Sequence, residues 1–205
     1  MGKGDETRQV VLGEALRTAS TLGLRGLTIG ALAEQTSMSK SGLFAHFKSK
    51  EQLQCAVIEY ASERFVERVL RPALREPRGE RRLRALFDRW LDWDGGADLA
   101  LPGGCVFISA SAELDDEADG VLRDRFVRNQ RDWLDTLASV FRSGITEGHF
   151  DADSDSEQFA HDLYGVMLAY HHATRLLRDP HAEQRARVAF ERLLSLARRP
   201  TPVPV

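Results

Sequence analysis

Long apolar runs are absent from this sequence of 205 residues. A membrane-crossing helix needs about 20 consecutive apolar residues, and the longest runs here are far shorter. The first residues, MGKGDETRQ, lack the apolar segment of a secretion signal. We therefore expect a cytoplasmic protein with no membrane partner. Apolar residues make up 42% and charged residues 29%, a balance that favours a globular chain over a disordered one.

Cysteine is scarce, with only Cys55 and Cys105 in the chain. Neither has a second Cys or a His at the spacing of a zinc ligand pair, so we expect two reduced thiols and no zinc site. Two histidines of one predicted helix, His161 and His172, would lie about 16 Å apart along its axis. They cannot share one ion within a chain, and we expect neither a metal nor a cofactor.

The motifs of common enzyme classes are also missing. The sequence has no phosphate-binding glycine loop, no G-x-S-x-G, no H-E-x-x-H and no dinucleotide fingerprint. Gly-Gly-Cys at 103–105 precedes an apolar run, but one Cys without a placed base does not indicate a nucleophile. We therefore expect no enzyme; an enzyme that uses a helical pocket is the weakest alternative.

Lysine is rare and clustered, since three of the four lysines lie within residues 40–50. Residues 1–50 carry a net charge of +3 and the remainder −6, for a total of −3. A basic segment on an acidic body favours a local anionic partner. The net negative charge argues against a sequence-indifferent DNA packager, which needs a broadly basic surface.

Helical periodicity is what the sequence has in abundance, and no pattern of a parallel sheet is present. We predict an all-α fold of about nine helices. Three short helices are expected first, at about 6–22, 29–35 and 40–46, followed by a bridging helix at 50–71 that stops near Pro72. Five more are expected at about 83–91, 105–114, 121–147, 159–177 and 186–197. The segment 105–114 alone also fits a strand, and its helical neighbours decide for helix.

Capping residues mark the expected helix boundaries. Thr28 and Ser39 are placed as N-caps, Ser49–Gln52 and Ser154–Glu157 fit capping boxes, and Gly148 ends a long helix. By role, the chain divides into residues 1–50, a helix-turn-helix domain; 51–74, the bridging helix; 75–198, a helical body; and 199–205, a Pro-rich tail expected to be disordered.

The short helices at 29–35 and 40–46 are separated by about four residues, which is helix-turn-helix geometry. The second would be about 10 Å long and fits end-first into the major groove of DNA, about 12 Å wide. Its exposed residues are small or polar and would read base edges: Lys40, Ser41, Gly42 and Ala45. Phosphate oxygens would bind to the hydroxyls and free N–H groups at the helix starts, Thr28 and Ser39. The lysines that follow the second helix, Lys48 and Lys50, would bind phosphate as well.

The segment LTIGALAEQTSMSKSGLFAHFKSKEQL resembles the DNA-binding signature of the TetR family of bacterial transcription regulators. The likeness runs from about Gly13 to Ala61. It implies an N-terminal helix-turn-helix, a C-terminal helical domain for effector binding and dimerisation within 75–198, a homodimer, and repression relieved by a small molecule. An activating or effector-independent regulator of the same fold is the alternative.

The resemblance carries over to single positions. Thr28 and Ser39 match the family's hydroxyls at the two helix starts, and His46 begins its His-Phe pair. Phe44 stands where the family usually has Tyr, so one phosphate hydrogen bond is lost. Ser37 occupies a turn position that is often Gly, which predicts a strained or differently capped turn. The predicted DNA contacts are Thr28, Ser39, Lys40, Ser41, Gly42, Phe44, Ala45, His46, Lys48 and Lys50.

Two further sets of residues follow for the C-terminal part. Large side chains on several helices would wall an effector pocket, although each residue taken alone favours a well-packed core: Trp90, Trp93, Cys105, Phe107, Phe126, Trp133, Tyr164, Met167, Tyr170 and His171. Apolar stripes on the last two helices would form the dimer interface that the resemblance implies: Val166, Tyr170, Leu177, Phe190, Leu193 and Leu194. A two-fold dimer would place two reading helices about 34 Å apart on double-stranded DNA with a near-palindromic operator.

Overall fold

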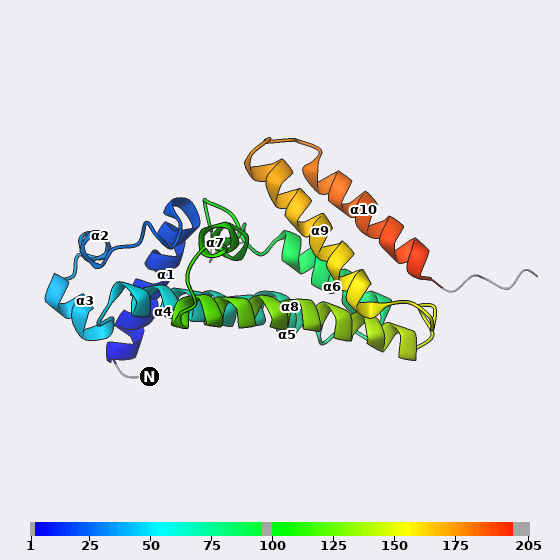
Figure 1. Cartoon of the computed structure of the whole chain (residues 1–205), viewed down its shortest axis with the longest axis horizontal. Helices are drawn as coiled ribbons and strands as arrows, with labels where there is room; N and C mark the ends of the chain where they lie inside the picture. The colour runs from blue at the N-terminus through cyan, green and yellow to red at the C-terminus, as the bar shows by residue number, and fades with distance from the viewer. Residues whose placement is uncertain (1–2, 96–99, 199–205) are drawn as a thin grey trace, which may run out of the picture. The chain divides into compact units, whose positions relative to one another are not determined.

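The computed structural model describes residues 3–95 and 100–198, and it confirms the all-α prediction (Figure 1). Within these ranges, the only β pairing is one isolated antiparallel bridge between Phe150 and Arg198. The helices are α1 (Lys3–Leu22), α2 (Ile29–Gln35), α3 (Lys40–His46), α4 (Lys50–Phe65), α5 (Arg71–Ala73), α6 (Glu80–Leu91), α7 (Val106–Leu114), α8 (Val121–Thr146), α9 (Ser156–Arg175) and α10 (Ala182–Ala197). The predicted tail lies outside the described residues.

The predicted bridging helix is one continuous element with an irregular turn. A π-helical segment, Val66–Leu70, joins α4 to α5, so the helix runs past Pro72 to Ala73 rather than stopping before the proline. A proline ring clashes with the carbonyl four residues earlier in a regular helix, and a wide turn relieves such a clash. With α4, this turn and α5 counted as one bridging helix, the described ranges contain the nine helices expected.

The start of α9 corrects one prediction. The N-cap is Asp155 rather than Ser154: its carboxylate accepts the backbone N–H groups of Glu157 at 2.9 Å and Gln158 at 3.0 Å. These bonds lower the pKa of Asp155, because they favour its charged form. The Ser154 N–H instead donates to the Asp151 carbonyl in the preceding turn. The end of α9 also differs, since Leu177 lies two residues beyond it.

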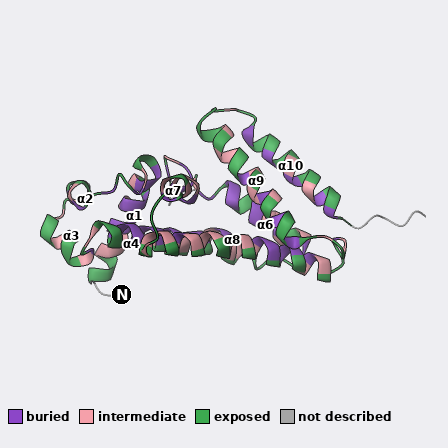
Figure 2. Ribbon diagram, in the orientation of Figure 1, coloured by how far each residue is buried: buried purple, intermediate pink, exposed green. Residues whose placement is uncertain are grey.

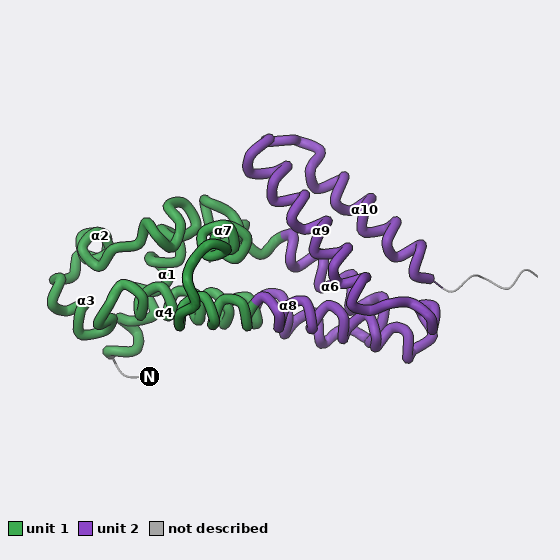
Figure 3. The backbone as a smooth tube through the Cα atoms, in the orientation of Figure 1, with its two compact units in different colours: residues 1–67, 92–129 green, residues 68–91, 130–205 purple. Residues whose placement is uncertain are grey.

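The chain forms two compact units, which interleave along the sequence (Figure 3). The first unit spans 1–67 and 92–129, and the second spans 68–91 and 130–205. The division by role at residues 50 and 74 remains a prediction.

The first unit is built around α1 and α4, with α2 and α7 also packed on α1 (Figure 2). Side chains such as Leu16, Leu43 and Val57 are completely buried in it. Phe65 meets both Trp93 and Phe107 edge-on, with ring centroids 5.2 and 5.9 Å apart. This aromatic cluster joins α4 to α7 and to the segment that follows α6.

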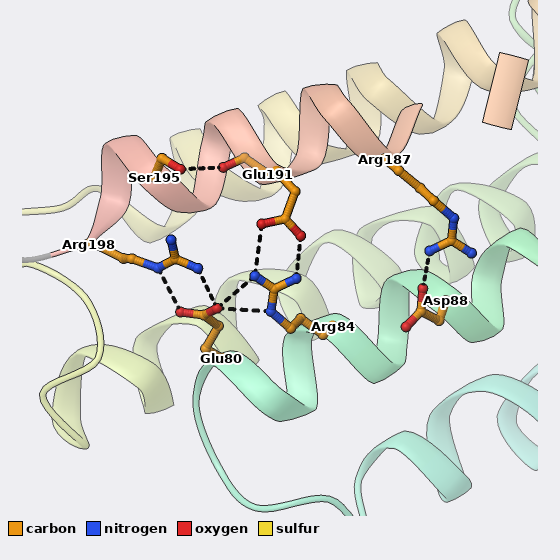
Figure 4. Close-up of polar contacts among 7 residues, drawn as sticks. All are labelled: Glu80, Arg84, Asp88, Arg187, Glu191, Ser195 and Arg198. Carbon is orange, nitrogen blue, oxygen red and sulfur yellow. Dashed lines mark hydrogen bonds and ion pairs between the residues drawn. The ribbon is translucent and has the colours of Figure 1, made fainter. Parts of the chain in front are cut away.

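The second unit has its most extensive contact between α9 and α10. The Phe141 ring stacks on both Phe150, at 4.5 Å, and Phe159, at 4.0 Å. Helix α6 packs on α10 through Phe87 and Phe190, whose centroids are 4.2 Å apart. Ion pairs border this contact and form what we call the α6–α10 seam (Figure 4): Glu80, Arg84, Asp88, Arg187, Glu191 and Arg198.

Candidate nucleic-acid interface

Helix α3 has one buried and one exposed face, as a DNA-reading helix requires. Leu43 and the Phe47 that follows the helix are 0% and 1% exposed, and they anchor it to the first unit. The predicted base readers Lys40, Ser41 and Ala45 are exposed, and Gly42 is partly exposed. The small polar surface therefore lies on the free side of the helix.

The turn between α2 and α3 is strained at the position that the sequence singled out. Ser37 has φ 54°, in the left-handed region that favours glycine. The Met38 N–H donates to the Ala33 carbonyl at 2.9 Å, which closes the C-terminus of α2. Ser37 replaces the usual Gly, and the predicted strain of this turn is confirmed. The hydrogen bonds of neighbouring backbone groups hold the serine in this conformation.

The helix starts carry the N-caps that were predicted. Thr28 Oγ1 accepts the Ala31 N–H at 3.1 Å, and Ser39 Oγ accepts the Gly42 N–H at 3.1 Å. Ser39 Oγ also lies 3.2 Å from Ser41 Oγ. The capping role is thus shown for both Thr28 and Ser39, and their contacts with phosphate stay predictions.

The two lysines after α3 differ in their surroundings. Lys50 Nζ donates to the Arg25 carbonyl at 2.5 Å, so this ammonium holds the turn between α1 and α2. Lys48 is exposed and forms no hydrogen bond or ion pair with any described residue. Of the two, Lys48 is the free cation next to the reading helix.

Two aromatic groups complete this surface. Phe44 is 52% exposed, so part of its ring lies at the surface of α3. His46 is half-buried, with its ring centroid 6.2 Å from that of Phe47. It lines a depression of about 420 Å³ together with Cys55 and Arg125. Burial raises the pKa of the Cys55 thiol, so the thiol stays protonated at neutral pH.

The predicted effector-pocket residues are divided between the two units. The first unit holds Trp93, Cys105, Phe107 and Phe126, all buried. Trp93 and Phe107 stack at 5.7 Å, and complete burial raises the pKa of the Cys105 thiol to about 11. A neutral thiol is a poor nucleophile and a poor metal ligand, so Cys105 has the character of an apolar lining group.

The second unit holds the other six: Trp90, Trp133, Tyr164, Met167, Tyr170 and His171. Trp90 meets Tyr170 edge-on at 5.8 Å, and the Tyr164 hydroxyl hydrogen-bonds Gln130 at 3.1 Å. His171 Nε2 is buried without a hydrogen-bond partner among the described residues, and burial lowers the pKa of this imidazole. A single pocket that unites both halves stays a prediction.

The predicted dimer residues lie along α9 and α10. A groove of about 600 Å³ runs between these helices, and Val166, Tyr170 and Leu193 line it. Phe190 and Leu194 are buried, with Phe190 stacked on Phe87 of α6, whereas Leu177 is 62% exposed in the turn between α9 and α10. Three of the six residues thus line the groove, and the dimer interface stays a prediction.

No group of three His, Cys, Asp or Glu side chains in residues 3–95 and 100–198 is arranged to hold a metal ion. None of the described helices is long and apolar enough to cross a membrane.

The turn at Leu24–Arg25 is the element that sequence reasoning missed. It precedes α2, and side chains of α4 and α7 hold it by hydrogen bonds. The bonding residue of α7, Glu113, is 89 residues away from Leu24 in the chain, so no local pattern signals the contact.

Comparisons with known proteins agree with this geometry. Residues 11–57 match the family described as bacterial regulatory proteins, tetR family, and residues 79–190 match the tetracyclin repressor-like C-terminal domain. No curated protein sequence is significantly similar to the chain.

Solved structures resemble the chain over nearly its whole length. A TetR-family transcriptional regulator from Cytophaga hutchinsonii is 21% identical with a TM-score of 0.82, covering 98% of this chain and 99% of that one. A TetR transcriptional regulator from Chloroflexus aurantiacus J-10-FL is 26% identical with a TM-score of 0.80, covering 95% and 96%. AibR, solved with isovaleryl coenzyme A and operator DNA, is 20% identical with a TM-score of 0.69, covering 95% and 100%. Because the C-terminal match alone spans more than half of its residues, this chain belongs to the TetR family of transcriptional regulators.

Proposed function

We propose that the protein is a cytoplasmic homodimeric repressor that reads a near-palindromic operator with α3 and is released from it by a small-molecule effector. The observation that carries the proposal is the two-faced α3: Leu43 anchors its inner face, and its free face presents the small or polar Lys40, Ser41 and Ala45 beside the exposed Phe44 ring. Small side chains let the helix backbone approach base edges closely, so Ser41, Gly42 and Ala45 are the proposed readers.

Phosphate contacts would fix the position of α3 on DNA. The exposed Lys48, the partly exposed His46 and the helix start at Ser39 lie at the two ends of α3, next to the readers in the chain. Phe44 would pack against sugar or a thymine methyl, because it has no hydroxyl for a phosphate oxygen. Lys50 retains two further N–H donors beyond its bond to Arg25, so it would both hold the turn and bind phosphate.

The groove between α9 and α10 supports the dimer. Its lining includes Gly165, Ala169 and Ala189, and such small residues would let another helix approach closely. A second copy would place its own α9 and α10 there in an isologous four-helix contact. Such a dimer presents two copies of α3 to the two halves of an operator.

An effector would bind among the aromatic groups of the C-terminal part. AibR is a structural neighbour solved with an acyl-coenzyme A and operator DNA, which is consistent with a ligand-responsive regulator. Release requires that the ligand bind the DNA-free conformation more tightly, with a coupling of about 1–3 kcal/mol. Saturating effector that leaves operator affinity unchanged would remove this part of the proposal.

The first experiment is a selection from sheared DNA of the source organism at near-physiological salt, followed by sequencing. We expect enrichment of a near-palindrome. On that operator, Lys48→Ala should weaken binding to all sequences alike and lower the salt slope by about one, because one phosphate contact is lost. Ser41→Ala should instead change the base preference. Uniform weakening by both variants would show that readers and anchors are wrongly assigned.

A further inference from the structure

All four backbone polar groups of Leu24 and Arg25 bond to side chains from elsewhere in the first unit. Glu113 accepts both N–H groups, with Oε1 3.0 Å from the Leu24 nitrogen and Oε2 2.8 Å from the Arg25 nitrogen. The Leu24 carbonyl accepts from Gln54 Nε2 at 2.8 Å, and the Arg25 carbonyl accepts from Lys50 Nζ at 2.5 Å. Two α4 side chains and one from α7 therefore clamp this turn.

The fit of Glu113 depends on Gly23. This glycine closes α1 with φ 75°, and its N–H donates to the Ala19 carbonyl at 2.9 Å. A Cβ at this position would lie 2.3 Å from Glu113 Oε1, which is inside van der Waals contact. The carboxylate therefore occupies the space that a side chain at position 23 would need.

The clamped turn leads directly into the helix-turn-helix. Leu27 N–H donates to the Leu24 carbonyl at 3.2 Å, and Thr28 then caps α2. Helix α2 in turn contacts α3, so only a few residues separate the turn from the proposed reading helix. At its other end, α7 carries Phe107 in the aromatic cluster with Phe65.

We propose that Glu113 is a positioning residue for DNA binding: it fixes the α1–α2 turn, and through it the orientation of α2 and α3. The inference rests on the proposed function for its DNA readout. Helix α7 would then be a second connection to the reading helix besides α4, because any displacement of α7 would move both carboxylate oxygens of Glu113 relative to the turn.

The sign of the effect separates positioning from electrostatics. DNA repels a carboxylate, so removing the charge of Glu113 by itself would strengthen binding, or leave it unchanged at high salt. Loss of two charge-assisted hydrogen bonds to the turn acts in the opposite direction. Glu117 provides a matched control. It lies four residues later, and among the described residues its carboxylate accepts hydrogen bonds from the exposed Arg25 side chain alone, at 2.8 and 3.2 Å.

The test compares Glu113→Ala, Glu113→Gln and Glu117→Gln in the full chain on the selected operator. We expect about tenfold weaker binding for Glu113→Ala. Glu113→Gln should lose less, because its amide oxygen still accepts one N–H. Glu117→Gln should bind like wild type. The slope of affinity against salt should not change, because Glu113 contacts no phosphate. Equal effects of the Glu113 and Glu117 variants, or tighter binding by Glu113→Ala, would overturn the proposal.

Amide hydrogen exchange provides a readout that does not require DNA. In Glu113→Ala, which removes both acceptors, exchange should accelerate at Leu24 and Arg25 and also at Ala31 and Gly42, with amides of α9 unchanged as an internal reference. Faster exchange at Leu24 and Arg25 alone would show a local bond without a positioning role and overturn the inference. If wild type selects no operator, the proposed function fails, while the exchange pattern still decides whether Glu113 orders α2 and α3.

Discussion

Polar side chains hold together both the turn at Leu24–Arg25 in the first unit and the α6–α10 seam in the second, but they do so in different ways. At the turn, the side chains of Glu113, Gln54 and Lys50 bond to backbone groups. At the seam, side chains pair with other side chains, as Arg84 does with Glu191 and Arg198 with Glu80 (Figure 4).

The difference determines what each region can contribute. A side chain that bonds to backbone fixes the path of the chain, and the unpaired backbone group would cost free energy if the bond were lost. Ion pairs at an exposed seam join two long flexible side chains and are screened by salt. The Phe87–Phe190 stack already packs α6 on α10, so the ion pairs of the seam add to a contact that apolar burial stabilises. Geometry at the turn is therefore more sensitive to substitution than geometry at the seam.

The largest effect should follow from Gly23→Ala, compared with Gly148→Ala in the second unit. Both glycines have φ 75°, but a Cβ at Gly148 would meet nothing within 4 Å. The backbone conformation alone should cost about 1 kcal/mol at either position. At Gly23 the new methyl group also displaces the Glu113 carboxylate and breaks two hydrogen bonds, for a total of about 2–4 kcal/mol. Denaturant unfolding measures both values.

The same pair of variants tests whether the turn acts through Glu113. Once Glu113→Ala has removed the carboxylate, adding Gly23→Ala should cost only the conformational part, so the two substitutions should be strongly non-additive. Operator affinity should fall for Gly23→Ala and not for Gly148→Ala. Equal destabilisation by the two glycine variants would show that the close approach at Gly23 contributes nothing.

Local signals were sufficient for the helix-turn-helix, where Thr28 and Ser39 cap helices whose observed bounds are those expected. They were insufficient at the start of α9, where two adjacent residues, Ser154 and Asp155, could each cap the helix. The Asp155 carboxylate accepts two N–H groups and binds them more strongly than a hydroxyl would. They were silent at the Glu113 contact, which joins residues 89 positions apart. Candidate pocket residues could be named from the sequence but not assigned to one cavity, because aromatic side chains occur both in packed cores and in cavity walls.

An intermediate effect is expected at the seam from Glu80→Gln. Hydrogen bonds from Arg198 and then Arg84 lower the pKa of Glu80 from its ordinary 4.5 to about 2, although partial burial opposes the shift. Since the folded-state pKa is lowered, the stabilisation is fully present above about pH 5 and is lost as the pH falls toward 2. With solvent screening, we expect Glu80→Gln to cost about 1–2 kcal/mol at pH 7.

The pH dependence provides the check on that prediction. The difference in unfolding free energy between wild type and Glu80→Gln should shrink as the pH falls from 5 to 2, because wild-type Glu80 then becomes protonated. Glu191→Gln should show the same trend with a smaller amplitude, since hydrogen bonds from Arg84 also lower the pKa of Glu191 but its side chain is 50% exposed. A difference that stays constant over this range would show that the charge of Glu80 does not stabilise the seam.

The smallest effect is expected for the ion pair of Arg187 and Asp88. Arg187 Nη1 lies 2.5 Å from Asp88 Oδ1, and the two side chains are 45% and 54% exposed. A double-mutant cycle with Arg187→Ala and Asp88→Ala should give a coupling of about 0.2–1 kcal/mol at low salt. At 1 M salt the Debye length is about 3 Å, and the coupling should vanish. Coupling that persists at high salt would mean that this ion pair holds α10 against α6 as strongly as hydrogen bonds to the backbone hold the turn at Leu24–Arg25. The contrast between the two regions would then fail, because side-chain pairs at the surface would determine geometry as strongly as bonds to the main chain.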